Sequence, residues 1–286
     1  DSTYKRAVWI NPKDKKGYYL LDEGITKSGN QKLRILNSDG VFVKNATVGR
    51  KTVILSDLVN DIPIIDTHGC QGHLNHTDIV NIVARRYNPF AKYKTIQHEK
   101  PSKVETFKQM QSKIDDNTSC ISCSYGEETE MNPRLFNKPN VDRMYAYKQL
   151  LSMRNGITRT DAEKEVDNVL KRTRLLYSAG NDGENFINNL LAHSGVEGVG
   201  GLDSVGNISK HSSSVDTIFT QHYEQYKFPV TSTKEGINIT GLKGTDYPFR
   251  HHGQVGELIQ TFSGTSFSAP IRAAKLALND MMEGVL

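Results

Sequence analysis

Short runs of apolar residues, separated by turn-forming residues, fill the first part of the chain. They cover residues 17–21, 32–36, 41–43 and 51–55, and Gly, Asn, Asp and Ser punctuate them. Such runs predict β-strands joined by tight turns. We therefore expect residues 1–56 to form a small β-rich region, either a unit of its own or an extension lying on the main domain. An inhibitory, propeptide-like role for this region stays open.

From about residue 57 the pattern changes to strands that alternate with helices. Apolar runs at 62–65, 93–96, 120–124, 175–178 and 196–202 predict strands, and helical spacing at 77–86, 160–174 and 271–282 predicts helices. Buried strands alternating with helices predict an α/β fold, with a doubly wound and mainly parallel sheet flanked by helices. We expect residues 57–286 to form this single domain, with ligands at the carboxyl ends of its strands.

Composition and charge exclude several classes of protein. The formal net charge of the 286 residues is +4, a mild excess without a basic stripe, so we expect no nucleic-acid partner. No apolar run of about 18 residues predicts a membrane span, and no signal peptide is visible. Three cysteines, Cys70, Cys120 and Cys123, do not make a disulfide framework. These features favour a reducing, intracellular compartment.

The segment Gly264-Thr265-Ser266, with Phe267-Ser268-Ala269-Pro270 after it, has the most specific chemistry in the chain. It places a serine hydroxyl at the start of a predicted amphipathic helix. A serine becomes a nucleophile when a neighbouring base takes its proton, and the N–H groups of a helix start favour negative charge nearby. Alone, Gly-Thr-Ser is also an ordinary helix cap. The whole stretch resembles the serine motif of subtilisin-like peptidases, which makes Ser266 the expected nucleophile.

A second segment, Ser178-Ala179-Gly180-Asn181-Asp182, follows a predicted buried strand. It resembles the Ala-Gly-Asn segment of the same family, whose asparagine donates a hydrogen bond to the oxyanion of the tetrahedral intermediate. The resemblance therefore implies that Asn181 is the oxyanion donor. A simple Asn-Asp-Gly turn is the alternative interpretation.

The resemblance also implies where a peptide substrate binds. The segment from Ser122 to Gly126 resembles the family's Ser-x-Gly strand, to which an extended peptide adds as a further strand. The pocket for the P1 side chain would lie between this strand and the segment before Asn181, lined by Ser124, Tyr125, Gly126, Ser178, Ala179 and Gly180. These small walls predict tolerance of large apolar P1 residues. Asp182 either lies near the pocket mouth and favours Lys or Arg at P1, or caps the turn and faces water.

The aspartate and histidine match the family less well. The strand at 62–65 ends in Asp66, which resembles the family's aspartate, and His73-Leu74-Asn75-His76 resembles its His-Gly-Thr-His motif without the Gly and Thr. By this alignment His73 is the general base and Asp66 orients it, whereas His76 has only a packing role. His68 is the alternative candidate for the base. The connection from Asp66 to His73 is shorter than the family usually has, which implies a trimmed sheet edge. The chain order Asp, His, Ser is that of subtilisin.

A metal site is the first competing interpretation. Cysteine and histidine are zinc ligands, and the candidates are Cys70, His73, His76, Cys120 and Cys123. Cys120 and Cys123 lie within a predicted strand, where positions three apart face opposite sides, so we expect no metal ligands and no required cofactor. Calcium is common in the family, but the basic connection at 85–89 carries no acidic ligands, so structural calcium is compatible with the chain without being indicated.

The resemblance implies a serine endopeptidase that hydrolyses protein or peptide substrates through an Asp/His/Ser triad and an acyl-enzyme. The alternative is a binding or structural protein that kept the fold and lost the activity. The changed residues after His73 and the short connection before it favour this alternative. The intact serine, asparagine, histidine and aspartate favour the enzyme. The natural substrate and the oligomeric state do not follow from the sequence.

Overall fold

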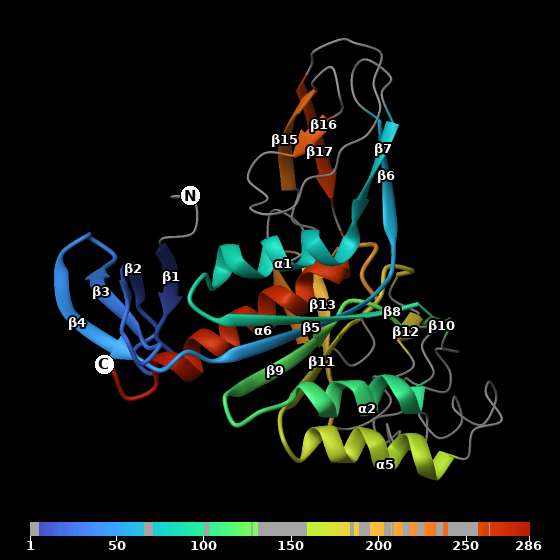
Figure 1. Ribbon diagram of the computed structural model, residues 1–286, viewed down its shortest axis with the longest axis horizontal. Coiled ribbons are helices and arrows are strands. Elements are labelled where there is room, and N and C mark those ends of the chain that lie inside the picture. The colour runs from blue at the N-terminus through green and yellow to red at the C-terminus, as the bar shows by residue number, and fades with distance from the viewer. Residues whose placement is uncertain are drawn as a thin grey trace.

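Figure 1 shows the computed structural model, in which an α/β layer structure lies beside a small antiparallel sheet. The structure describes residues 6–65, 71–99, 103–126, 128–130, 159–183, 186–188, 195–202, 207, 209–213, 218–221, 226–232, 237–239, 257–262 and 264–286.

A six-stranded parallel sheet forms the centre of the protein. It consists of β5 (Thr52–Leu58), β8 (Lys92–His98), β9 (Thr118–Cys123), β11 (Arg174–Ser178), β13 (Glu197–Leu202) and β14 (Ile218–Gln221). The strand order is β14-β13-β11-β9-β5-β8, and every neighbouring pair is parallel. The chain runs outward from β5 to β8 and then returns to the other side of β5 to form β9. The expected doubly wound sheet is confirmed, and its topological switch point lies between β5 and β9.

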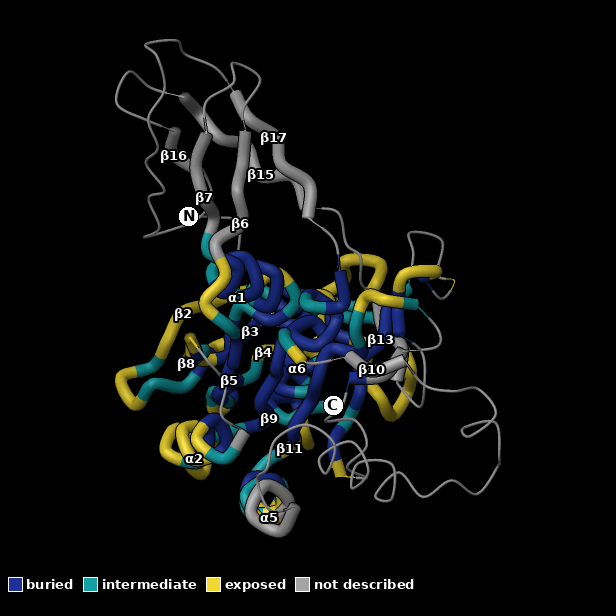
Figure 2. The backbone as a smooth tube through the Cα atoms, turned by 90° about the vertical axis from the view of Figure 1, so that its right-hand side faces the viewer, coloured by how far each residue is buried: buried dark blue, intermediate teal, exposed yellow. Residues whose placement is uncertain are grey.

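Helices cover both faces of this sheet (Figure 1). On one face α1 (His76–Tyr87) packs beside α6 (Thr265–Met282), and on the other lie α2 (Lys103–Lys113) and α5 (Arg159–Leu170). Alternate residues of β5 supply the two cores: Val53 and Leu55 face α1 and α6, whereas Ile54 faces α2. Both faces of the strand are therefore buried, which explains its unbroken apolar sequence. Figure 2 shows the buried residues concentrated in the sheet and in α6.

The N-terminal region forms an antiparallel sheet of β1 (Arg6–Ile10), β2 (Gly17–Ile25), β3 (Gln31–Asn37) and β4 (Phe42–Val48). Its inward residues, among them Trp9, Leu20 and Ile35, are buried against Leu278 and Met281 of α6. The Trp9 indole also donates a hydrogen bond of 2.9 Å to Asn279 Oδ1. This sheet therefore packs on the C-terminal end of α6, as an extension of the main domain.

The boundary between the two regions lies before β5, and the boundary expected at residues 56 and 57 needs correction. The apolar run at 51–55 was assigned to the N-terminal region because it follows three similar runs. Instead, β5 pairs in parallel with both β8 and β9, at the centre of the main sheet. A strand buried on both faces has no polar alternation, and its length and composition do not reveal its partners.

The strand expected at 62–65 also does not join the main parallel sheet. β6 (Asp61–Ile65) and β7 (Gln71–Asn75) form a separate antiparallel hairpin inserted between β5 and α1. Two further small sheets consist of β10 (Glu128–Glu130) with β12 (Phe186–Asn188), and of β16 (Ile237–Ile239), β15 (Tyr226–Ser232) and β17 (Glu257–Phe262). The predicted helices are present as α1, α5 and α6, although α5 ends at Leu170, before the start of β11.

Candidate active site

A buried carboxylate and a buried imidazole meet where β5 ends and α1 begins. Asp57, 2 % exposed, is the penultimate residue of β5, and its Oδ2 lies 2.5 Å from Nδ1 of His76. The same carboxylate accepts hydrogen bonds from Thr77 Oγ1 at 3.2 Å and from the backbone N–H of Leu58 at 2.8 Å. An ionised carboxylate only accepts hydrogen bonds, so Nδ1 carries the proton of the imidazole and Nε2 is its basic nitrogen.

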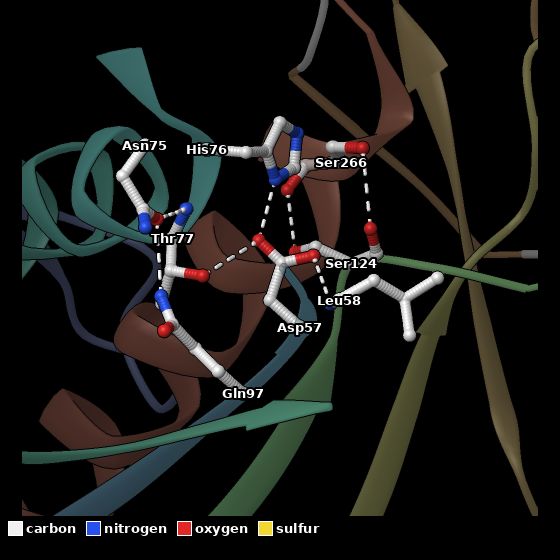
Figure 3. Close-up of polar contacts among 8 residues, drawn as sticks. All are labelled: Asp57, Leu58, Asn75, His76, Thr77, Gln97, Ser124 and Ser266. Carbon is white, nitrogen blue, oxygen red and sulfur yellow. Dashed lines mark hydrogen bonds and ion pairs between the residues drawn. The ribbon is translucent and has the colours of Figure 1, made fainter. Parts of the chain in front are cut away.

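The helix start fixes the position of this histidine. Asn75 is the N-cap of α1, and its side chain accepts the backbone N–H of Thr77 at 2.9 Å. His76 is therefore the first helical residue, and its ring stacks on Phe267 with centroids 5.8 Å apart. Phe267 follows Ser266 in α6, so α1 and α6 bring the imidazole and the serine together. Figure 3 shows Ser266 beside the His76 ring and Asp57 at its Nδ1.

Ser266 is the second residue of α6 and is partly exposed. Its backbone carbonyl accepts a 2.7 Å hydrogen bond from Ser124 Oγ, and its own Oγ donates to the Ser124 carbonyl at 3.4 Å. Gly264, before the helix, has φ of 140°, a conformation that residues with a Cβ rarely adopt. The end of β9 and this turn thus hold the hydroxyl at the carboxyl edge of the sheet.

Asn181 lies just after β11, and its side chain reaches the same helix start. Its Oδ1 accepts hydrogen bonds from the backbone N–H of Thr265 at 2.8 Å and from Thr265 Oγ1 at 2.9 Å. Thr265 Oγ1 in turn accepts the backbone N–H of Gly180 at 3.1 Å. Because the amide oxygen is held by Thr265, the orientation of the amide is fixed, and its NH₂ group is the donating end. A polar donor thus lies next to the residue that precedes Ser266.

A buried polar chain supports the site from behind. The Ser56 hydroxyl contacts His98 Nε2 at 3.1 Å and the Tyr125 hydroxyl at 3.0 Å, which links the ends of β5, β8 and β9. Burial lowers the pKa of His98 more than the hydrogen bond with Gln109 and the nearby Asp57 raise it. Burial also raises the pKa of Tyr125 well above its usual value. The three side chains are therefore neutral near pH 7 and hold the strand ends in register.

The structure brings some of the sequence-predicted residues together and not others. Ser266 and Asn181 lie near each other, linked through Thr265. Asp66, with His68, lies outside the described residues. His73 lies in β7, opposite Pro63, and α1 begins three residues later, at His76.

Asp57 and His76 are a hydrogen-bonded pair that the sequence interpretation did not bring together. The signal for Asp57 was an apolar run, 53–55, followed two residues later by an acidic residue. The signal for His76 was the preceding Asn75, because asparagine is a preferred N-cap.

The six residues expected to line a substrate pocket lie at the carboxyl ends of two neighbouring parallel strands, β9 and β11. Ser124 continues β9 through a hydrogen bond of its N–H to Ser56 O at 3.1 Å, and Ala179 continues β11 through one to Val199 O at 2.9 Å. Tyr125, Gly126, Ser178 and Gly180 complete the set. Asp182 is exposed.

Cys120 and Cys123 lie on opposite faces of β9, as their spacing predicts. Cys120 is in the core beneath α6, and Cys123 is in the core beneath α2. Burial raises the pKa of each thiol to about 12, so both are protonated at neutral pH. Within the described ranges, no three His, Cys, Asp or Glu side chains converge as metal ligands would. In the same part of the chain, no helix has the length and apolar character of a membrane span.

Comparisons with known proteins give similarities of fold at low sequence identity. No protein-family profile matches the chain, and no curated protein matches its sequence. Among solved structures, the prenylagaramide maturation protease PagA is 16 % identical, with a TM-score of 0.46 over 80 % of this chain and 76 % of that one. The nisin leader peptidase NisP from Lactococcus lactis is 15 % identical, with a TM-score of 0.47 over 82 % and 78 %. The subtilisin-like protease Apa1 from Pseudoalteromonas sp. AS-11 is 9 % identical, with a TM-score of 0.46 over 82 % and 84 %.

Proposed function

We propose that the protein is a serine endopeptidase in which Ser266 is the nucleophile, His76 the general base and Asp57 the residue that orients the base. The observation that carries the proposal is the 2.5 Å contact between Asp57 and His76, buried beside Ser266 at the switch point of the sheet. Ligands of doubly wound sheets bind at such a point. A carboxylate, an imidazole and a hydroxyl in this order are the parts of a hydrolytic triad.

In the proposed mechanism, His76 Nε2 takes the proton of the Ser266 hydroxyl while its oxygen attacks a peptide carbonyl. Asp57 stabilises the imidazolium that forms. The Asn181 NH₂ group and the backbone N–H of Ser266 donate to the oxyanion. His76 then gives its proton to the leaving amine, which departs as the acyl-enzyme forms. Water, deprotonated by His76, attacks the acyl-enzyme, and Ser266 regains its proton as the acid product leaves.

This assignment replaces His73 and Asp66 with His76 and Asp57. Three features support the replacement: the pair is in hydrogen-bond contact, both side chains are buried, and α1 places His76 against Phe267. The chain order Asp, His, Ser is unchanged. The inserted hairpin β6–β7 now accounts for the segment between Asp57 and His76 along the chain.

A peptide substrate fits the backbone around Ser266. Residues 124–126 extend the line of β9 beside the nucleophile, and an extended peptide adds to such a segment through backbone hydrogen bonds. This supports a peptide or protein as the substrate, in preference to a small ester.

One observation favours the non-catalytic alternative. The Ser266 hydroxyl donates to the Ser124 carbonyl, and it must rotate about χ1 to reach His76. Such a rotation between staggered positions is ordinary for a serine, and catalytic hydrogen bonds are often loose before substrate binds.

A fluorophosphonate probe with the purified chain separates the two alternatives. We expect covalent labelling of wild type at Ser266, cleavage of a mixed peptide library, and loss of both in Ser266→Ala with an unchanged melting temperature. A folded wild type that is neither labelled nor able to cleave peptides would instead be a binding protein.

A further inference from the structure

A single buried asparagine joins the ends of the two strands beside the candidate nucleophile. Asn188 is the last residue of β12 and is 1 % exposed. Its side-chain nitrogen donates to the Tyr125 carbonyl at 3.1 Å and to the Ser178 carbonyl at 3.0 Å. Tyr125 follows β9 and Ser178 ends β11, so one amide group spans the space between these neighbouring strands. The β10–β12 pair carries the asparagine into this position.

The side chain of Asn188 leaves no room for a Cβ at Gly126. A Cβ added to Gly126 would lie 2.0 Å from Asn188 Nδ2 and 2.3 Å from its Cγ. Distances below 3.0 Å do not occur between such atoms in real structures. The glycine is therefore required at this position because the amide of Asn188 lies directly against its backbone.

The position of the reacting carbonyl follows from the contacts already described. It must lie next to Ser266 Oγ, with its oxygen near Asn181, and so between the segment after β9 and the segment after β11. In the proposed peptidase, we place the side chain of the residue that carries this carbonyl, P1, between residues 124–126 and 178–180, the two segments expected to line its pocket. Asn188 bridges these two segments through its hydrogen bonds to the Tyr125 and Ser178 carbonyls.

We infer that Asn188 is a specificity-determining residue that closes the P1 subsite and restricts P1 to Gly, Ala or Ser. The inference rests on the proposed peptidase function. It reverses the expectation of large P1 side chains, which was based on the small residues of the two walls. That expectation did not include Asn188, a residue 63 positions beyond Tyr125 in the sequence.

A series of peptides that differ only in P1 tests this inference. Wild type should cleave a P1 Ala peptide with kcat/KM at least about tenfold above that of the P1 Phe peptide, since a subsite that lacks space excludes extra carbon atoms. In Asn188→Ala the Phe-to-Ala ratio should rise at least about tenfold, mainly through a lower KM for P1 Phe. Asn188→Asp keeps the side-chain volume and loses the two hydrogen bonds that the amide nitrogen donates. It should therefore slow the cleavage of all substrates and leave the Phe-to-Ala ratio unchanged. An unchanged ratio in Asn188→Ala, or wild-type preference for Phe, overturns the inference.

Two controls separate this result from a failure of the proposed function or of folding. Fluorophosphonate labelling of Ser266 does not depend on a P1 side chain, so labelling with no change in P1 ratio counts against Asn188 alone. A chain that cannot be labelled at Ser266 overturns the peptidase and the subsite together. Melting temperatures test the packing without activity: Gly126→Ala should lower the melting temperature less in the Asn188→Ala background than in wild type. Equal losses in the two backgrounds would contradict the proposed contact.

Discussion

Asp57 Oδ2 lies 2.5 Å from Nδ1 of His76, although the two residues are 19 positions apart in the sequence. The β6–β7 hairpin leaves the sheet after β5 and returns directly to the N-cap of α1. The ends of this hairpin are therefore close together, and its length does not affect the geometry of the pair. The geometry of the Asp57–His76 pair is set by β5 and α1, both of which are packed into the main core.

The pair gives the first prediction. Asp57→Asn should lower kcat by about 10⁴-fold, because an amide no longer holds the imidazole in the required tautomer. His76→Ala should be at least as damaging. His73→Ala, in β7, is the matched control and should keep kcat/KM within about threefold, as expected for a residue outside the reacting groups. Steady-state kinetics on one peptide substrate compare the three variants. Loss of activity in His73→Ala with retention in His76→Ala would restore the alignment predicted from the sequence.

The second prediction concerns the oxyanion. Asn181→Ala should lower kcat by about 10²–10³-fold with little change in KM, because its amide donates to charge that develops in the transition state. The neighbouring Asp182 is exposed, so Asp182→Asn should leave kcat unchanged and should not alter the ratio of kcat/KM for P1 Lys and P1 Glu peptides. A changed ratio would place the Asp182 carboxylate near the substrate.

The third prediction is a pH dependence of stability. Burial lowers the pKa of His98 in the folded protein, whereas the unfolded chain protonates it near about pH 6.5. Above that pH both states are neutral, and His98 contributes no pH dependence. As the pH falls below it, the unfolded state binds the proton first, so stability decreases. The melting temperature should therefore fall between pH 7 and pH 5.5, and fall less in His98→Gln. A steeper fall in the variant would contradict the assignment.

The fourth prediction concerns the N-terminal sheet. Trp9→Ala removes a large buried side chain and should cost about 3–5 kcal/mol of folding free energy. Trp9→Phe keeps most of the packing but loses the hydrogen bond to Asn279. It should therefore cost far less folding free energy: about 1 kcal/mol for the lost hydrogen bond, in addition to the cost of the smaller side chain. Denaturant titrations measure both. Since Ser266 lies roughly 20 Å away along α6, at 1.5 Å per residue, kcat/KM of the folded Trp9→Phe variant should equal that of wild type. A large change in kcat/KM would indicate that the sheet acts on the site.

The sequence predicted the layers of the fold, whereas the site that we propose differs from the one it indicated at two residues. The runs that became β9, β11 and β13 are mostly buried on both faces, and they alternate with helical periodicity, whereas β8 is a more polar edge strand. Ser266 is the proposed nucleophile from the sequence and from the structure alike, because its motif is contained in one short segment at a helix start. Such local signals can be recognised in the sequence without knowing which strands pair.

Asp57 was not predicted because its role depends on long-range pairing. β5 follows four strands of an antiparallel sheet, and nothing local distinguishes a fifth strand of that sheet from the first strand of another. With residues 51–55 in the N-terminal region, Asp66 is the next aspartate after an apolar run, and the resemblance of residues 73–76 to the family's histidine motif separately indicates His73. Asn188 was not predicted for a related reason: the two carbonyls that it contacts belong to other strands.

Helix α6 contacts both regions of the protein, with the serine at its first turn and the N-terminal sheet at its last turn. It also follows every strand of both regions in the chain. During synthesis, therefore, both sheets leave the ribosome before the helix that covers them. The N-terminal sheet cannot bury its inward face until α6 has been made. The nucleophile arrives in the same segment that completes both cores. A nascent or truncated chain without α6 would thus be poorly folded and would lack the proposed nucleophile at once, so the proposed activity would appear only in molecules whose core is complete.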